Sequence, residues 1–367
     1  MTAAPGTPAA EAARLLDALL DHGAQPVDCA ILQPAETLLD LYGEDIRARA
    51  YITADPLAGE LMLRPDFTVP VVQMHMAGGA EPARYAYAGP VFRRQERADG
   101  RAREYLQAGY ELFGGDDPAA ADAEVFALIA GLLDGLPVRP VTGDIGLLMA
   151  AVAGLDTTAP RKAALMRHIW RPARFRALLD RFGGRAAPDP ARAALLARLA
   201  AGDVPAQIAA AGPVIGLREP AEVAARAARL LEDAAEAPIP AAQVTALDRL
   251  LALAGPAAEQ VAPLHALAAD LPGLAPAAER FAARLEAFAA RGIDATALAF
   301  EASFGRTTLE YYDGFVFGFL AGDAAPVASG GRYDALTARL GQGRAIPAVG
   351  GVIRPAAVAR LRAQGGR

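Results

Sequence analysis

The sequence predicts an α+β fold, built as one discontinuous domain that carries an all-α insertion. Segments with the texture of β-strands occur near both ends of the chain, in residues 1–154 and 293–367. Between them, residues 155–292 consist of short helical phrases rich in Ala, Leu, Arg and Glu, and proline interrupts these phrases often. Because proline ends a helix, the middle is expected to be a set of short packed helices. We therefore predict a core of 1–154 and 293–367 and a helical insertion of 155–292.

The first part of the core is expected to begin with a helix and two short strands. Residues 9–21 repeat apolar side chains at helical spacing, which predicts an opening helix. Residues 48–64 are typical of two short strands joined by a turn at Asp55 and Pro56. Residues 119–134 predict a further helix.

The clearest pair of strands covers residues 84–93 and 104–113. Side chains of a strand alternate between its faces, so Gln107 and Glu111 share one face. Gly109 lies between them and leaves a gap in which a ligand can sit. A buried amide and a buried carboxylate both need partners, because unpaired burial costs a few kcal/mol. The alternative is a sheet face that is open to water.

Arginines gather where these two strands are joined. Arg93 ends the first strand, and the polar tip that follows contains Arg94, Arg97, Arg101 and Arg103. Arginine forks match the oxygens of carboxylates and phosphates, so the tip could close over an anion. A solvated, charged hairpin tip is the alternative.

The second part of the core returns to strand texture. We expect strands in 296–304 and 309–320, a glycine-rich turn that enters a helix in 329–336, and a strand followed by a closing helix in 345–361. As a strand, 309–320 would place Tyr312 on a face with glycines and Tyr311 on a face with phenylalanines. The phenylalanine face is expected to be core.

Residues 63–68 (LRPDFT) contain a second set of polar side chains. Asp66 and Thr68 share strand parity and could together hold an ammonium group. Ordinary turn chemistry is the alternative, because Asp and Thr are common turn and cap residues.

Composition excludes several classes of protein. A formal net charge of −6 over 367 residues argues against a nucleic-acid binder that relies on a net-basic surface. A single cysteine, Cys29, excludes an internal disulfide framework and a multi-thiolate zinc site, and the four histidines lack metal-ligand spacing. We expect no metal and no cofactor. Without a targeting signal or a membrane span, the chain is expected to be cytoplasmic.

Four segments, in this order, resemble class II histidyl-tRNA synthetases. They are LRPDFT at 63–68, AGPVFRRQERADGRAREYLQAGYELFG at 88–114, LEYYDGFVFGF at 309–319 and GGRYDAL at 330–336. The second is similar to motif 2 of that family, and the last two are similar to its histidine-specific signatures. The resemblance implies a class II synthetase-like antiparallel sheet flanked by helices.

The resemblance also implies an amino-acid pocket. Asp66 falls where the family has a carboxylate for the α-amino group, with Thr68 beside it. Arg93 matches the motif 2 arginine, which in the synthetase contacts carboxylate and α-phosphate. The remaining implied pocket residues are Gln107, Glu111, Tyr311 and Tyr312, of which the two tyrosines match those that line the imidazole end.

The sequence departs from the synthetase where cations are needed for amino-acid activation. The arginine that precedes the paired tyrosines is replaced by Thr307, and Arg306 is one residue away. The motif 3 arginine position holds Ala357, and Arg354 lies three residues early. Because preorganised cations supply much of the rate of such a reaction, two losses leave little activation.

A synthetase-like core without these arginines resembles the regulatory subunits of ATP phosphoribosyltransferase. That resemblance implies a non-catalytic protein that activates the short-form catalytic subunit and mediates histidine feedback at the first step of histidine biosynthesis. It further implies a homodimer within a hetero-oligomer, histidine as effector, and neither tRNA nor a membrane as partner. The alternatives are a truncated histidyl-tRNA synthetase or another amino-acid-activating enzyme, and a free-standing histidine sensor or interaction module.

Overall fold

The structure is a computed structural model that describes residue 4 and residues 6–42, 46–95, 102–213, 217–306, 311–322 and 325–365. Within these residues, nine strands form one mixed sheet. In spatial order they are β1 (Gln25–Pro26), β5 (Ala83–Phe92), β6 (Glu104–Phe113), β12 (Ala348–Ile353), β11 (Ala328–Arg332), β10 (Phe315–Leu320), β7 (Arg139–Asp144), β9 (Ala299–Glu301) and β8 (Ala254–Pro256). All pairings from β5 to β7 are antiparallel, whereas β1 joins β5, and β9 joins β7, in parallel.

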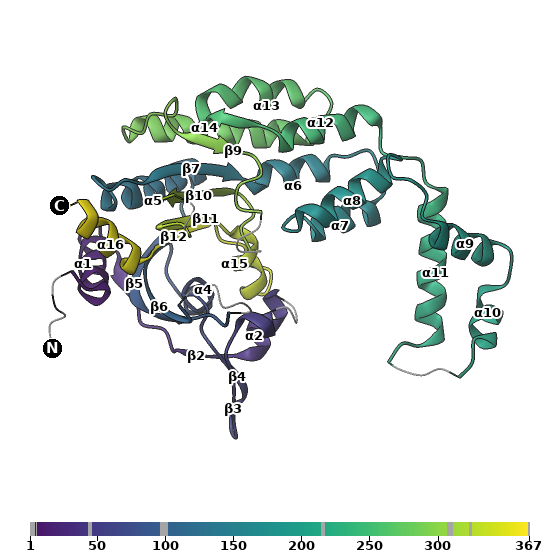
Figure 1. The fold of residues 1–367 in the computed structure, drawn as a ribbon, viewed down its shortest axis with the longest axis horizontal. Coiled ribbons are helices and arrows are strands. Elements are labelled where there is room, and N and C mark those ends of the chain that lie inside the picture. Colours follow the sequence, from purple (N-terminus) through teal and green to yellow (C-terminus); the bar gives the residue numbers. More distant parts are fainter. Residues whose placement is uncertain are drawn as a thin grey trace.

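The α+β prediction is confirmed, and helices flank the sheet (Figure 1). One face is covered by α1 (Pro8–Asp21), α5 (Pro118–Leu132) and α16 (Pro355–Gly365), with α14 (Ala275–Ala290) packed on α5. On the other side lie α4 (Thr68–Met76) and α15 (Asp334–Leu340), which contact each other. The predicted helices at 9–21 and 119–134 correspond to α1 and α5. Thr7 and Asp117 cap these two helices through their side chains, which explains where each begins.

A small second sheet lies beside α4. Within the described residues it has the order β2 (Leu32–Pro34), β4 (Gly59–Leu63) and β3 (Ile52–Asp55). Helices α2 (Ala35–Tyr42) and α3 (Ile46–Arg49) connect β2 to β3. The two strands expected in 48–64 are therefore confirmed as β3 and β4, and Asp55 accepts hydrogen bonds from the backbone of Leu57 and Ala58 in the turn between them.

Phenylalanine side chains form the contact between the sheet and its helical layer. Phe315, Phe317 and Phe319 of β10 are at most 3% exposed, and each ring lies within about 6 Å of Phe126 on α5. Phe288 of α14 packs against Phe126 as well. The prediction that this face is core is confirmed.

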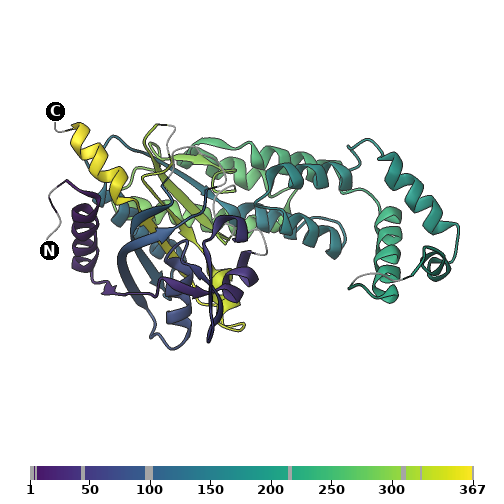
Figure 2. The same cartoon turned by 60° about the horizontal axis from the view of Figure 1, so that its bottom comes forward.

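The middle of the chain is mostly helical and extends away from the sheet (Figures 1 and 2). After α6 (Ile145–Ala153) it contains α7 (Ala159–Arg167), α8 (Pro172–Phe182), α9 (Pro190–Ala200), α10 (Val204–Ala210), α11 (Pro220–Ala235), α12 (Ala241–Leu251), α13 (Val261–Leu267) and the 3₁₀ helices η1 (Ala257–Gln260) and η2 (Pro272–Leu274). Helices α9 to α11 form the outer end of this arm in both views.

The prediction of an all-α middle is wrong at one place. Strand β8 lies inside 155–292 and pairs with β9, so the insertion supplies the edge of the main sheet. Helix α14 also belongs to the layer that covers α5. The boundaries of the insertion at 155 and 292 stay a prediction.

Two predicted elements near the C-terminus differ from the structure. The strand expected in 309–320 begins only at Phe315, so Tyr311 and Tyr312 precede it and strand parity does not place them. The glycine-rich turn expected in 329–336 is strand β11, and its helix begins at Asp334. A Cβ at Gly330 would lie 2.3 Å from the backbone oxygen of Gly350, so glycine is required there by close strand packing.

Candidate functional site

Glu111 is the centre of a buried polar cluster on the α4 side of the main sheet. Its side chain projects from β6 and is 1% exposed as a residue. Oε1 accepts hydrogen bonds from Thr68 Oγ1 and Tyr87 OH, both at 2.9 Å, and Oε2 accepts one from Tyr333 OH at 2.5 Å. Three hydroxyls of the chain therefore surround one carboxylate.

Strand alternation places Gln107 on the same face as Glu111. Gln107 is 2% exposed, and its Oε1 has no hydrogen-bond partner among the residues that the structure describes. An open, water-exposed sheet face is therefore excluded for both residues. A buried acceptor without a donor is costly, and a ligand with an N–H group would satisfy it.

Two hydroxyl donors of this cluster were not predicted as site residues. Tyr87 lies on β5, where it is paired with Gly109, the residue between Gln107 and Glu111. A Cβ at Gly109 would lie 2.4 Å from Tyr87 OH, so only glycine leaves room for the tyrosine side chain here. The pairing of the two strands places Tyr87 opposite Gly109, and this pairing would have identified the tyrosine as a neighbour of Glu111. Tyr333 belongs to the GGRYD segment, whose side-chain directions the sequence did not reveal.

Asp66 and Thr68 lie at the start of α4, and the prediction that they share strand parity is wrong. Thr68 is the first residue of the helix, and Asp66 precedes it in the loop. Asp66 is 3% exposed, and its Oδ1 accepts a hydrogen bond from the backbone N–H of Val69 at 3.4 Å. Burial raises the pKa of Asp66, whereas the charge of Arg93 and the nearby backbone N–H groups lower it.

Arg93 fixes the loop that carries Asp66. Its Nε donates a hydrogen bond to the carbonyl oxygen of Pro65 at 3.0 Å, and its guanidinium lies 5.9 Å from the ring centre of Tyr105. The structure describes the other tip arginines only in part. Arg94 donates its backbone N–H to the carbonyl oxygen of Arg49, and the carbonyl oxygen of Arg103 accepts from the backbone N–H of Arg93. Arg97 and Arg101 lie outside the described residues.

Tyr311 and Tyr312 form an aromatic wall beside the cluster. Their ring centres are 4.8 Å apart, and Tyr311 is edge-on to Tyr333 at 6.0 Å. Tyr311 OH lies 3.5 Å from Thr68 Oγ1. Burial and the nearby charge of Glu111 raise the pKa of Tyr312, so its hydroxyl stays protonated and can donate. The structure thus brings Thr68, Glu111 and Tyr311 into contact and places Tyr312 beside them.

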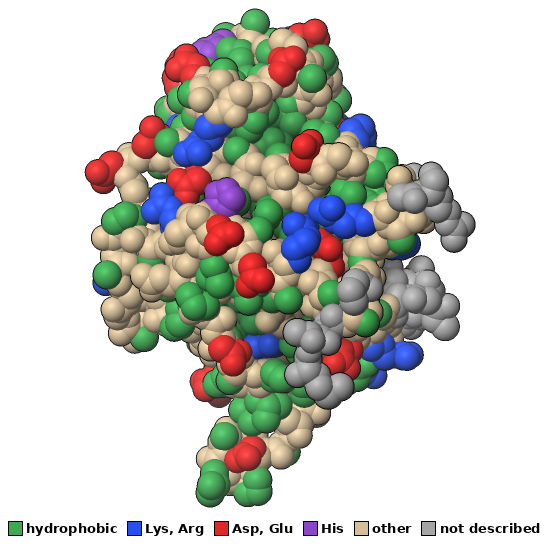
Figure 3. Space-filling view, turned by 90° about the vertical axis from the view of Figure 1, so that its left-hand side faces the viewer, with side chains coloured by type: hydrophobic (Ala, Val, Ile, Leu, Met, Phe, Trp, Pro, Cys, Tyr) green, Lys and Arg blue, Asp and Glu red, His purple; other side chains and the backbone are tan. Residues whose placement is uncertain are grey.

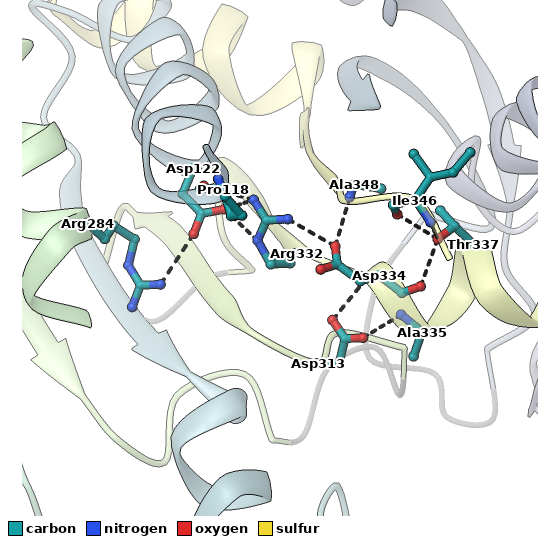
Figure 4. A network of polar contacts seen from close by, with 10 residues as sticks. All are labelled: Pro118, Asp122, Arg284, Asp313, Arg332, Asp334, Ala335, Thr337, Ile346 and Ala348. Atoms are coloured by element: carbon teal, nitrogen blue, oxygen red, sulfur yellow. Dashed lines mark hydrogen bonds and ion pairs between the residues drawn. The ribbon is translucent and has the colours of Figure 1, made fainter. Parts of the chain in front are cut away.

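A buried network of charges holds the segment that carries Tyr333 (Figure 4). Arg332 donates to Asp122 Oδ1 through Nε at 3.0 Å and through Nη2 at 2.8 Å. Its Nη1 donates to Asp334 Oδ1 at 3.0 Å. On the far side of Asp122, Arg284 bonds Oδ2 at 3.3 Å and also bonds Asp144 at 2.5 Å. The network therefore joins α5, β11 and α14.

The same network connects the loop after the paired tyrosines to α15. Asp313 accepts hydrogen bonds from the backbone N–H groups of Asp334, at 3.1 Å, and of Ala335. Asp334 Oδ1 also accepts from the backbone of Ala348 at 2.8 Å. Burial and the charge of Asp334 raise the pKa of Asp313 to about 7. The segments YYD and GGRYD are thereby held in one arrangement.

The electrostatic character of the cluster is that of a site for a cation or an N–H donor. Its acceptors are Asp66, Glu111 and the side-chain oxygen of Gln107. Burial raises the pKa of Glu111 to about 7, although the bonds from Tyr333, Tyr87 and Thr68 lower it. A bound positive charge would stabilise the ionised form.

This pKa predicts how stability changes with pH. A carboxyl whose pKa is raised from 4.5 to about 7 on folding binds its proton more tightly in the folded state. Its contribution to the free energy of unfolding is therefore present below pH 4.5 and lost as pH rises to about 7. A shift of this size corresponds to about 3 kcal/mol.

We expect the difference between the wild type and Glu111→Gln to show this loss in urea unfolding between pH 4.5 and 8. Asp313 is unchanged in the variant, so its own titration cancels in the difference. A difference that does not vary with pH would contradict the raised pKa of Glu111.

The arginines considered for nucleotide activation make other contacts. Thr307 lies outside the described residues. Arg306 is 4% exposed, donates from Nε to the carbonyl oxygen of Ile169 at 2.9 Å, and lies 5.0 Å from the ring centre of Phe175. Arg354 donates to the carbonyl oxygen of Pro326. Arg306 is thus directed to the helical middle of the chain.

The described residues contain no group of three or more His, Cys, Asp and Glu side chains that could hold a metal ion. In the same part of the chain, no helix combines the length and apolar character needed to cross a membrane.

Comparisons with known proteins agree on the fold and on the class of relative. The family model described as histidyl-tRNA synthetase matches residues 9–231 and 220–358. A protein of Allorhizobium ampelinum named ATP phosphoribosyltransferase regulatory subunit is 35% identical over 355 residues, which is 92% of this chain and 94% of the relative. A protein of Brucella canis with the same name is 35% identical over 346 residues, which is 89% of this chain and 90% of the relative.

Two solved structures share the fold. One, from Bacillus halodurans C, is described as an ATP phosphoribosyltransferase regulatory subunit/histidyl-tRNA synthetase and has a TM-score of 0.65 at 20% identity over 98% of this chain and 82% of that one. The other is a histidine–tRNA ligase subunit from Alicyclobacillus acidocaldarius, with a TM-score of 0.61 and 23% identity. The match covers 100% of this chain and 98% of that one.

Proposed function

Because the chain belongs to the family of ATP phosphoribosyltransferase regulatory subunits, we propose that it activates the short-form catalytic subunit and mediates histidine feedback at the first step of histidine biosynthesis. In this proposal it has no aminoacylation activity of its own and is cytoplasmic. Its effector is histidine, and neither tRNA nor a membrane is a partner.

The buried carboxylate of Glu111 is the observation that carries the histidine part of the proposal. Glu111 can accept a hydrogen bond from an imidazole N–H or pair with an imidazolium. For this, one of its present hydroxyl donors, such as that of Tyr333, has to move away. Asp66 and Gln107 Oε1 supply two further acceptors on the same side of the sheet, which suit an α-ammonium group. Seven residues are proposed to form the pocket: Asp66, Thr68, Arg93, Gln107, Glu111, Tyr311 and Tyr312.

The contacts of Arg306 support the absence of amino-acid activation. Adenylate formation concentrates negative charge on the α-phosphate, and several fixed cations there supply much of the rate. The guanidinium of Arg306 is instead buried against Phe175 and bonded to a backbone carbonyl of the α7–α8 turn. Arg354 is likewise bonded to a backbone carbonyl. A pocket that keeps its acceptors without these cations suits binding of an amino acid better than its activation.

Feedback requires a coupling free energy between histidine and the assembly. Histidine must bind more tightly to one arrangement of the complex than to another, with a difference of about 1–3 kcal/mol in typical allosteric proteins. The network of Asp122, Arg332 and Asp334 offers a physical route, because it fixes Tyr333, which contacts Glu111. We propose that histidine replaces this tyrosine contact and thereby shifts the segment.

A homodimer within the hetero-oligomer is proposed from exposed apolar side chains. Five of them lie on or beside the small sheet, namely Ile31, Leu32, Ile52, Leu57 and Met74. Leu57 is 99% exposed at the tip of the β3–β4 hairpin, which projects from the body (Figures 1 and 3). Several exposed apolar side chains in one region are typical of a protein interface, and a twofold dimer would bury them.

Two assays test the function. We expect no histidine-dependent exchange of pyrophosphate into ATP by the isolated chain. Adding the chain to the short catalytic subunit is expected to give phosphoribosyl transfer, in a complex whose mass by light scattering contains two or more copies of this chain. Transfer is expected to fall when histidine is added.

The outcomes separate the alternatives. Robust exchange by the isolated chain would show an amino-acid-activating enzyme and overturn the proposal. Histidine binding without any effect on, or association with, the catalytic subunit would indicate a free-standing sensor.

A further inference from the structure

A cavity lies on the face of the main sheet opposite Glu111. Its volume is about 460 Å³, and its polar wall consists of His22, Arg84, Tyr110, Glu124 and Arg291. Tyr110 is next to Glu111 on β6, and alternation directs it to the other face. The strand thus separates this cavity from the pocket proposed for histidine. Pockets for small molecules commonly have volumes of about 300–1,000 Å³.

The wall of the cavity is held by a fixed set of hydrogen bonds. Arg84 donates to both oxygens of Glu124, from Nε at 2.7 Å and from Nη2 at 2.9 Å. Tyr110 OH donates to Glu124 Oε1 at 2.9 Å. These bonds hold the pKa of Glu124 below its usual value, despite the opposing effect of burial, so it is ionised at neutral pH. The three side chains come from β5, β6 and α5, which makes their relative positions rigid.

Donors remain on this wall after Glu124 has been satisfied. A guanidinium has five N–H groups, and Arg84 uses two of them here. The Nη2 atom of Arg291 is 3.7 Å from Glu124 Oε2, which is too far for a hydrogen bond, and its side chain is 40% exposed. Arg84, Arg291 and Glu124 together carry one net positive charge. The wall therefore has more N–H donors than the single carboxylate of Glu124 can satisfy.

The apolar part of the cavity wall consists of Ala127 and Leu128 of α5. On the side of the molecule on which α1 and α16 lie, basic and acidic side chains are interspersed with hydrophobic ones (Figure 3). A ligand that fits both parts has an oxyanion at one end and a short apolar portion at the other.

We propose that this cavity binds a small molecule bearing a phosphate or a carboxylate, with the oxyanion between Arg84 and Arg291 and the remainder against Leu128. Arginine forks suit both oxyanions. The site goes beyond the proposed regulatory function, because it lies on the opposite face of the sheet and needs neither histidine nor a catalytic subunit.

Arg291 also has a purely structural role that the experiment must separate. It is the C-cap residue of α14, where a positive charge favours the negative end of the helix dipole by about 0.3–1 kcal/mol. That role predicts a small loss of stability in a variant without the charge, but no change in anion binding.

The test is calorimetric titration of the full chain with inorganic phosphate and, separately, with succinate, at constant ionic strength set by chloride. We expect saturable binding of at least one anion, weakened about ten-fold or more in Arg291→Gln. Arg280→Gln is the matched control, because Arg280 is an exposed arginine of the same helix. Binding in this control is expected to equal that of the wild type.

The two titrations also decide whether the oxyanion is a phosphate or a carboxylate. Binding of phosphate alone indicates a phosphate, binding of succinate alone indicates a carboxylate, and binding of both indicates a site that accepts either. The proposal would be overturned if neither anion bound saturably. It would also be overturned if Arg291→Gln and Arg280→Gln weakened anion binding equally. Thermal unfolding of the two variants measures the helix-end contribution independently. Failure here would leave the histidine response untouched, because neither histidine nor the catalytic subunit is present.

Discussion

Asp122→Ala is expected to lower the free energy of unfolding by about 3–5 kcal/mol, the range found when one partner of a buried ion pair is removed. Asp122 is 2% exposed and contacts both Arg332 and Arg284. Arg284 keeps Asp144 in the variant. Among the described residues, Arg332 keeps Asp334, which is more exposed, and a hydrogen bond to the carbonyl oxygen of Pro118. The buried part of its charge therefore loses its buried carboxylate partner.

Urea unfolding of the full chain measures this effect, with Asp134→Ala as the control. Asp134 is an exposed aspartate just beyond the end of α5, so its removal is expected to change stability by less than about 0.5 kcal/mol. The double variant Asp122→Ala with Arg332→Met removes the uncompensated charge as well, and we expect it to regain part of the loss. Equal stability of Asp122→Ala and the control would contradict a structural role of the network.

Local patterns predicted the part of the site that lies on the central hairpin. Residues 84–93 and 104–113 alternate strongly enough to show strands, and alternation alone placed Gln107 and Glu111 on one face. The structure agrees, because β5 and β6 pair in regular register and both side chains are buried. Nothing in this step depends on distant parts of the chain.

The charge network was beyond the reach of local patterns. Arg284 and Asp122 are 162 positions apart, and Arg332 and Asp122 are 210 apart. Their contact depends on how α14 is placed on α5, which periodicity does not specify. Strand β8 was missed for a related reason, since its three residues Ala254–Pro256 become a strand only through pairing with β9.

Two kinds of local signal were also misleading. The glycines of β11 are typical of a turn in the sequence, but in the structure they allow close packing of neighbouring strands. Spacing predicts that Asp66 and Thr68 share a strand face, but Thr68 begins a helix whose first turn lies beside Glu111. In both cases the residue types are compatible with either structure, and tertiary packing selects one.

Glu111→Gln is expected to weaken histidine binding by about ten- to a hundred-fold. The substitution keeps the size of the side chain but removes its charge, and a hydrogen bond to a charged group contributes about 1.5–3 kcal/mol. Because Gln has only one acceptor oxygen, the hydroxyls of Thr68, Tyr87 and Tyr333 also compete for it. The variant therefore loses both the ionic partner and part of the geometry.

Histidine titration calorimetry, with and without the catalytic subunit, measures this loss. Glu104→Gln is the matched control, because Glu104 is an exposed carboxylate on the same strand, and it is expected to bind histidine like the wild type. The variant should still activate the catalytic subunit, since Glu111 is 1% exposed and contributes almost nothing to the surface. Added histidine should no longer inhibit transfer at concentrations that inhibit the wild type. If folded Glu111→Gln retained the wild-type histidine response, the effector would bind elsewhere, and the acceptor cluster around Glu111 would not be the feedback site.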